Sequence, residues 1–149
     1  MRRWLPASAE PHLGNAELIL HAGDLLEEGV LERLRCYAPV RAVLGNNDHT
    51  LVGLLPSTLA FEVAGVKVGM IHDSGPSAGR ARRMHRRFPA SDLVVFGHSH
   101  APVNDLGEDG QVLFNPGSPT QRRAQPQHSL GVLTISDGEI VERRIVTLD

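Results

Sequence analysis

The chain has little cysteine, few aromatic residues and no long run of apolar side chains: its 149 residues include one Cys, four Phe, one Tyr and one Trp. Because Cys36 has no second cysteine to pair with, a disulfide within the chain is excluded. The absence of an apolar run of about 18 residues excludes a membrane-spanning helix, and the first residues lack the apolar centre of a signal peptide. We therefore expect a soluble, cytoplasmic protein that does not associate with a membrane.

The net charge of the chain is also small. Its 15 Lys and Arg against 17 Asp and Glu give a formal charge of −2. This balance argues against a protein that wraps nucleic acid, so nucleic acid is not expected among the partners. Hydrophobic residues make up 41% of the chain and can form an aliphatic core, and the length predicts a single domain over residues 1–149. Eight histidines against one cysteine favour sites built from nitrogen and oxygen atoms.

Four apolar runs each end abruptly in polar residues that can bind a metal ion. They are Ala16–Asp24, Val40–Asp48, Val66–Asp73 and Leu93–His100. Runs of this length fit strands that are buried on both faces of a sheet. Amphipathic segments at Leu26–Arg35 and Ser77–Arg87 lie between runs and predict helices, with Pro89 ending the second. Strands that alternate with helices predict a sheet that is at least partly parallel.

Other segments predict antiparallel pairs. Leu59–Val63 and Val66–Ile71 flank Ala64-Gly65, and Leu130–Ser136 and Glu139–Val146 flank Asp137-Gly138. Two-residue connections of this kind are typical of β-hairpins. Gln111–Phe114 predicts one further short strand, which is followed by a turn.

The ends of the four apolar runs carry the chemistry. In open α/β sheets, ligands bind at the carboxyl ends of the strands, and each predicted strand ends in candidate ligands. Taken singly, each of these residues is better explained as a turn or structural residue, but as an ordered set they predict a metal site. The candidates are Asp24, Asn46, Asp48, His72, His98 and His100.

The motifs HAGD, GNND, IHD and GHSH, in this order and followed by FNPGS, resemble those of the calcineurin-like metallophosphoesterase superfamily, in particular its small bacterial and archaeal phosphodiesterases. The resemblance covers the chain from about Glu17 to its end. It implies an α/β fold, a four-layer α-β-β-α sandwich of two mixed sheets flanked by helices. It also implies metal-dependent hydrolysis of a small phosphate-ester substrate, with phosphodiesters favoured.

The resemblance also implies a role for each ligand. Asp24 matches the carboxylate that bridges two metal ions, and Asn46, His72 and His98 match the other ligands of the second ion. His100 matches a ligand of the first ion. Oxygen and nitrogen ligands without sulfur suit Mn²⁺, Fe²⁺, Zn²⁺ or Ni²⁺. Two such ions would hold a bridging hydroxide and clamp the phosphoryl oxygens during in-line attack.

Four residues near these ligands have expected roles in catalysis or substrate binding. Asp48 matches a residue that supports the ligands. Asn47 stands where several branches have a histidine that protonates the leaving group, and an amide can donate a hydrogen bond there but no proton. His49 is an alternative proton donor. Arg122, next to Arg123, is a candidate for contact with the substrate phosphate.

The chain departs from the family pattern at its start, because it contains no Asp-x-His. In the family, a first strand ends in that motif and supplies most ligands of the first ion. Glu10-Pro11-His12 has the same spacing but no apolar strand before it. Either an upstream strand exists or the first metal site is lost. As it stands, we expect the chain to bind one ion or none and to have weak activity, and exposed sheet edges favour a homo-oligomer.

Two further alternatives concern function. The arginines between Arg80 and Arg87 predict a solvated helix face, or else a surface that attracts an anionic substrate. The retained histidines favour an enzyme. The missing Asp-x-His favours a non-catalytic scaffold that binds other proteins, similar to the retromer subunit that resembles these enzymes.

Overall fold

The structure is a computed structural model and describes residues 5–24, 28–46, 48, 51–119 and 128–148. The α-helices in these ranges are α1 (Glu10–Gly14), α2 (Glu28–Arg35) and α3 (Arg80–Arg87). The strands are β1 (Ile19–His21), β2 (Val40–Ala42), β3 (Thr58–Val63), β4 (Val66–Ile71), β5 (Leu93–Val95), β6 (Val103–Leu106), β7 (Val112–Asn115), β8 (His128–Ser136) and β9 (Glu139–Leu148). Single 3-10 turns lie at Ala7–Ala9 and Glu108–Gly110.

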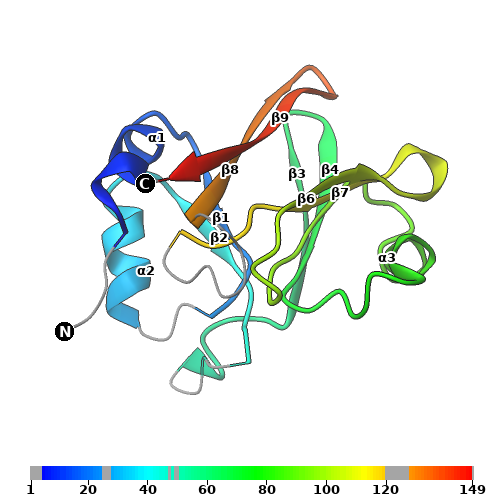
Figure 1. Cartoon of the computed structure of the whole chain (residues 1–149), viewed down its shortest axis with the longest axis horizontal. Helices are drawn as coiled ribbons and strands as arrows, with labels where there is room; N and C mark the ends of the chain where they lie inside the picture. Colours follow the sequence, from blue (N-terminus) through cyan, green and yellow to red (C-terminus); the bar gives the residue numbers. More distant parts are fainter. Residues whose placement is uncertain (1–4, 25–27, 47, 49–50, 120–127, 149) are drawn as a thin grey trace.

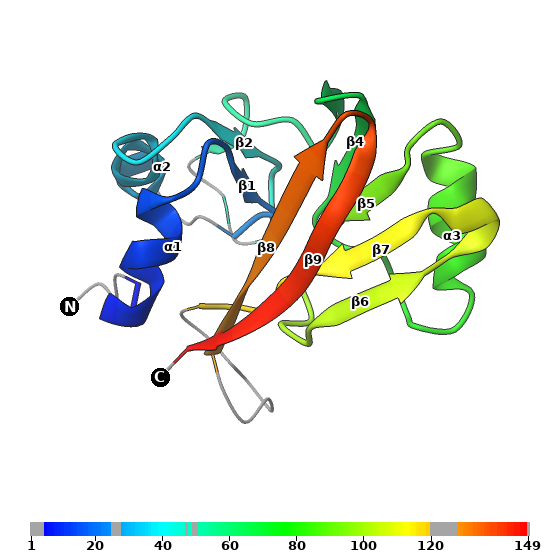
Figure 2. The ribbon, with the colours of Figure 1, turned by 90° about the horizontal axis from the view of Figure 1, so that it is seen from above.

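The strands form one five-stranded mixed sheet and two strand pairs. The large sheet has the order β3-β4-β5-β7-β6, in which β4, β5 and β7 run parallel and the two edge strands run antiparallel to their neighbours. A parallel pair, β1-β2, lies beside α1 and α2, while α3 covers the opposite side of the large sheet (Figure 1). Seen from above, the antiparallel β8-β9 hairpin runs between these two halves (Figure 2).

The central strand β5 shows why continuous apolar runs predict buried strands. Leu93 and Val95 pack into one core with β4 and β7, whereas Val94 packs into a second core on the other face. That second core contains Met84 of α3 and Phe96. Because successive side chains of a strand point to opposite faces, a strand covered on both sides must be apolar at every position.

A third core supports the first half of the chain. Ile19 of β1 and Ala42 of β2 pack against Leu31 and Leu34 of α2 and against Leu51. The apolar face predicted for α2 is therefore the face that covers the β1-β2 pair.

Both predicted hairpins are confirmed. Residues Ala64 and Gly65 have φ values of 46° and 87°, and Asp137 and Gly138 have φ values of 50° and 78°. Positive φ at both central residues is the geometry of a tight two-residue hairpin turn. The predicted parallel pairing is also confirmed, between β1 and β2 and between β4, β5 and β7.

Three expectations need correction. The predicted second mixed sheet is not continuous, because within the described residues its strands form two separate pairs, β1-β2 and β8-β9. The helix expected over Ser77–Arg87 begins only at Arg80, since Gly79 before it has a left-handed backbone (φ 74°). The edge strand β6 was not expected, because its sequence VNDL has only two apolar residues. None of the helices in the described ranges is both long and apolar enough to cross a bilayer.

Candidate functional site

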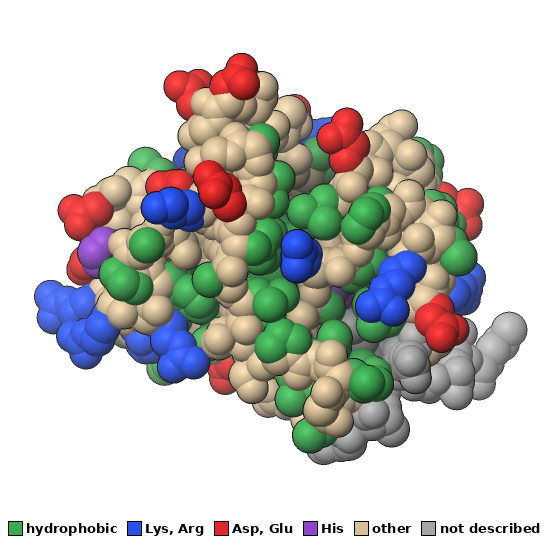
Figure 3. Space-filling view, turned by 180° about the vertical axis from the view of Figure 1, so that it is seen from behind, with side chains coloured by type: hydrophobic (Ala, Val, Ile, Leu, Met, Phe, Trp, Pro, Cys, Tyr) green, Lys and Arg blue, Asp and Glu red, His purple; other side chains and the backbone are tan. Residues whose placement is uncertain are grey.

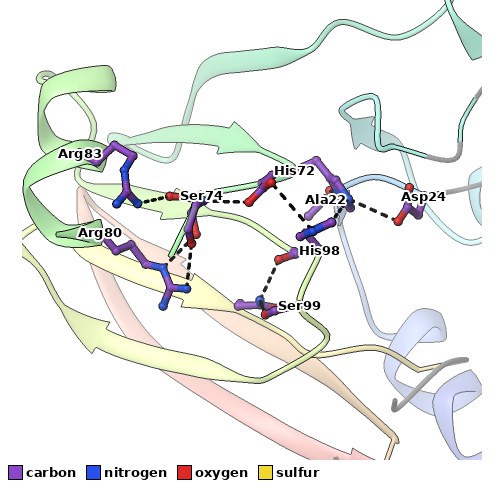
Figure 4. A network of polar contacts seen from close by, with 12 residues as sticks. Ala22, Asp24, His72, Ser74, Arg80, Arg83, His98 and Ser99 are labelled. Carbon is purple, nitrogen blue, oxygen red and sulfur yellow. Dashed lines mark hydrogen bonds and ion pairs between the residues drawn. The ribbon is translucent and has the colours of Figure 1, made fainter. Parts of the chain in front are cut away.

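Three predicted ligands meet where strands from different sheets end. Asp24 follows β1, His72 follows β4 and His98 follows β5. The Nε2 atom of His72 lies 3.3 Å from Oδ2 of Asp24 and 3.3 Å from Nδ1 of His98. Figure 4 shows these side chains as one end of a polar row that continues towards α3. The prediction that the strand ends bring these residues together is confirmed by this geometry.

The ring of His72 is oriented by a backbone carbonyl. Its Nδ1 lies 2.6 Å from the carbonyl oxygen of Ala22. A carbonyl can only accept, so Nδ1 carries the proton, and the neutral ring then has its lone pair on Nε2, facing Asp24 and His98. Histidines that bind metals are usually held in this way by their other nitrogen. His72 is buried, with 5% of its surface exposed.

Asp48 ties together the ends of β1 and β2. Its Oδ2 atom accepts hydrogen bonds of 2.8 Å from the backbone N–H groups of Asp24 and Gly45. Only 1% of Asp48 is exposed, so the carboxylate satisfies two N–H groups that have little access to water. Asp48 therefore fixes the backbone beside Asp24, and its role in function stays a prediction.

The backbone of the site is strained at three predicted ligands. Asp24, His98 and His100 have φ values of 60°, 69° and 61°, in the left-handed region that residues with a side chain rarely adopt. Strained residues of this kind cluster at functional sites, where the surroundings hold them in place. For Asp24, the two bonds to Asp48 and to His72 provide that support.

Gly23 is required by close packing against His72. A Cβ atom at this position would lie 2.5 Å from Nδ1 of His72, and φ at Gly23 is 108°. We expect Gly23→Ala to lower the free energy of unfolding by about 2 kcal/mol or more, because strain and a clash add together. Urea unfolding measures this change. Gly53→Ala is the control, since φ is 91° but no atom lies within 4 Å; equal losses for both variants would contradict the clash.

Asn115 fixes the loop that carries His98 and His100. Its side chain is fully buried, and Nδ2 donates to the carbonyl of Gly97 at 3.2 Å and to Oγ of Ser99 at 3.4 Å. Its Oδ1 accepts from the backbone N–H of Gly117 at 2.9 Å. The turn Asn115–Ser118 is therefore hydrogen-bonded to the loop that carries the two histidines.

His21 is a site residue that sequence reasoning did not select. Its Nδ1 accepts a hydrogen bond of 3.2 Å from the backbone N–H of Gly23. Burial lowers the pKa of His21 to about 4, although the nearby carboxylates of Asp48 and Asp24 oppose that shift. The HAGD motif contains this histidine, but a motif does not tell how strongly the fold removes its ring from water.

The lowered pKa of His21 predicts a pH-dependent stability. The unfolded chain binds a proton at His21 below pH 6.5 and the folded chain only below about 4, so stability falls as pH drops through this window. Between pH 7 and 4.5 the loss amounts to about 2 kcal/mol. His21→Asn keeps an acceptor for Gly23 but does not titrate, so its urea unfolding with chelator present should lose less stability. Identical pH profiles for the two proteins would contradict this.

The remaining predicted residues do not belong to the group formed by Asp24, His72 and His98. Asn46 is exposed after β2, and His100 is partly buried beyond His98. Asn47, His49, Arg122 and Arg123 lie outside the described residues. Glu10 and His12 lie on α1, whose sequence EPHLG is helical rather than extended. Among the residues that the structure describes, no three His, Cys, Asp or Glu side chains surround a common point as a closed metal cage would.

Asp73 was not selected as a site residue, although it follows His72 directly. Its Oδ2 lies 3.9 Å from Nε2 of His98, and its Oδ1 accepts from the N–H of Gly75 at 2.8 Å. Its place as the third residue of the IHD motif was the sequence signal that could have identified it. It places a second carboxylate beside the histidine pair.

Comparison with known proteins decides the family. The calcineurin-like phosphoesterase superfamily domain matches residues 2–138. The chain belongs to this superfamily. A probable metallophosphoesterase of Methanothermobacter thermautotrophicus is 36% identical over 146 residues, which cover 95% of this chain and 82% of the relative. One of Methanocaldococcus jannaschii is 34% identical over 136 residues, covering 89% of this chain and 68% of the relative.

Several solved structures share the fold of this chain. Vps29 of Entamoeba histolytica in complex with Zn²⁺ has a TM-score of 0.79 at 21% identity, covering 100% of this chain and 92% of that one. An archaeal phosphodiesterase has a TM-score of 0.71 at 22% identity, covering 90% of this chain and 84% of that one. The expected resemblance and the mixed α/β fold are therefore confirmed.

Proposed function

We propose that this chain is a phosphodiesterase that uses a divalent metal ion held by Asp24, Asn46, His72 and His98. Phosphoester hydrolysis and binding of divalent metals follow from the family. The observation that carries the proposal is the row of donor atoms at 3.3 Å spacing from Asp24 through His72 to His98. The preference for diesters and the identity of the metal, whether Mn²⁺, Fe²⁺, Zn²⁺ or Ni²⁺, are part of the proposal.

The residues present fit such an ion by their chemistry. A neutral imidazole with its lone pair turned to a carboxylate and to a second imidazole is a donor set for first-row divalent metals. When bound, the ion would activate a water molecule and polarise the phosphoryl oxygens. The side chains of Asp24, His72 and His98 would have to move closer around the ion. Asn46, which follows β2, would provide an amide oxygen as the fourth ligand.

Other residues act on the substrate and on the ligands. Asp48 holds the backbone of Asp24 in its left-handed conformation, so that the carboxylate points to His72. We assign to Asn47 a hydrogen bond to the phosphoryl group and to Arg122 a contact with the substrate phosphate. A proton for the leaving group would come from His49 or from water. His100 belongs to the first metal position, for which the chain offers Asp24 as its other ligand.

We further propose that the chain binds one ion and turns over slowly. With Mn²⁺ and bis(p-nitrophenyl) phosphate, we expect weak hydrolysis by this chain and faster hydrolysis by a version that carries a strand ending in Asp-x-His at its N-terminus. Metal analysis should find one ion per chain in the first protein and two in the second. Absence of turnover in both would contradict the enzyme proposal, and two ions in the unextended chain would contradict the single-ion proposal.

A non-catalytic scaffold is the second candidate function. The fold similarity to Vps29 over the whole length of this chain favours it. A scaffold predicts no hydrolysis by the extended version either, although the histidines would still bind an ion. The homo-oligomer and the cytoplasmic location also remain predictions, which size-exclusion chromatography with light scattering and cell fractionation would test.

A further inference from the structure

A hollow of about 410 Å³ lies between α3 and the segment that follows β4. Its volume is within the range of pockets that bind small molecules. Three arginines are among the residues that line it, Arg83, Arg86 and Arg87, against one acidic residue, Asp73. Seen from behind, basic side chains gather at the edge of the molecule where α3 lies (Figure 3). The hollow is therefore electropositive.

The cation at one wall of the hollow is fixed in place. Arg83 donates from Nη1 to the carbonyls of Ser74 at 2.6 Å and Pro76 at 3.1 Å, and from Nη2 to that of Ala78 at 2.9 Å. Gly75 leaves room for it, because a Cβ there would lie 2.7 Å from Nη1. Arg83 thus keeps its positive charge at a fixed place, since its partners are dipoles and not carboxylates.

The two faces of α3 differ in how their charges are balanced. Arg82 and His85 point to the turn that follows β6, where they pair with Glu108 and Asp109 at distances from 3.2 to 3.9 Å. Arg86 and Arg87, on the side of the hollow, take part in none of the ion pairs between described residues. A phosphate group would provide the negative charge that these two arginines lack among the described residues, and its oxygens accept hydrogen bonds from guanidinium groups.

The hollow adjoins the candidate metal site. Asp73 lines it and also lies 3.9 Å from His98 through Oδ2. Figure 4 shows the polar row from Arg83 and Arg80 through Ser74 to His72 and Asp24. A ligand in the hollow would therefore lie beside Asp73, whose carboxylate disfavours negative charge next to it and favours that charge nearer to Arg86 and Arg87.

We propose that Arg86 and Arg87 bind a second phosphate group of the substrate, while the diester to be cleaved lies at Asp24, His72 and His98. The substrate class is then a small phosphodiester that carries a further phosphate, such as a 5′-phosphorylated dinucleotide. This inference rests on the proposed function for the identity of the substrate, but the anion site itself does not.

Binding of inorganic pyrophosphate tests the anion site without catalysis. Calorimetry on the whole chain, with chelator and at low salt, should show binding that Arg86→Ala/Arg87→Ala weakens at least about 10-fold. The matched control is Arg35→Ala/Arg82→Ala, which removes two exposed positive charges elsewhere and should change the affinity less than about 2-fold. No binding by the parent chain, or equal losses in both double variants, would overturn the site.

Kinetics test whether the bound phosphate belongs to the substrate. The parent chain should have a lower KM for a 5′-phosphorylated thymidine dinucleotide than for the unphosphorylated one. In Arg86→Ala/Arg87→Ala that difference should disappear, while turnover of bis(p-nitrophenyl) phosphate stays unchanged. Equal KM values in the parent chain would overturn the substrate assignment. Absence of any turnover would contradict the proposed function, while pyrophosphate binding would still decide the anion site.

Discussion

Asp24→Asn is expected to lower turnover of bis(p-nitrophenyl) phosphate with Mn²⁺ by about 100-fold or more. Substitution of residues that only support a metal ligand already lowers activity by up to about 100-fold. The substitution removes the charge that faces Nε2 of His72 at 3.3 Å. Asparagine tolerates the left-handed backbone that Asp24 adopts, so the loop should keep its conformation. Affinity for Mn²⁺, measured by calorimetry, should fall together with turnover.

The matched control for Asp24→Asn is Asp137→Asn. Asp137 is also an aspartate in the left-handed region (φ 50°), but it lies in the turn between β8 and β9 and is exposed. Its replacement should leave turnover, metal affinity and thermal stability unchanged. If both variants lost activity equally, or if Asp24→Asn kept full affinity for Mn²⁺, Asp24 would not be a metal ligand.

Asp48→Ala is expected to lower the free energy of unfolding by about 4 kcal/mol. The substitution leaves the N–H groups of Asp24 and Gly45 without their acceptor in a place that water hardly reaches, and each such loss costs about 1 to 3 kcal/mol. It also removes the link between the ends of β1 and β2. Urea unfolding followed by circular dichroism measures the change in midpoint at constant slope.

Asp92→Ala is the control for this prediction. Asp92 also accepts a backbone hydrogen bond, from Lys67 at 2.9 Å, but it is exposed. Water can replace its single bond, so the loss should stay below about 1 kcal/mol. Asp48→Asn retains one oxygen acceptor and should fall between the two. Equal losses for Asp48→Ala and Asp92→Ala would show that the buried link does not stabilise the strand ends.

The strand ends could be predicted because burial and chemistry leave separate marks on the sequence. The run that contains β5 is apolar up to Phe96, since both faces of the strand are covered, and polar residues begin at His98, directly after Gly97. Parallel neighbours end at the same edge, so His72 and His98 had to lie close together. The turn at Asp137-Gly138 was predictable because both residues tolerate positive φ values, whereas at Ala64-Gly65 the glycine alone provides that signal.

Features that depend on backbone atoms and on tertiary packing could not be predicted. The carbonyl of Ala22 that orients His72 has no signature, because every residue carries a carbonyl. The low pKa of His21 comes from desolvation in the folded chain, which the sequence around it does not specify. The separation of the second layer into β1-β2 and β8-β9 depends on which strands pair, and apolar patterning does not specify neighbours.

The position of His72 makes the site a joint between two separately hydrogen-bonded parts of the molecule. His72 extends from the five-stranded sheet, and it contacts Ala22 and Asp24, which follow β1 of the smaller parallel pair. An ion that binds only when both parts are docked stabilises the docked state by an amount that grows with the logarithm of its concentration relative to its dissociation constant. Saturating metal should therefore slow amide hydrogen exchange in β1 and β2 more than in β4 and β5, so that the ion fastens two halves of the protein together.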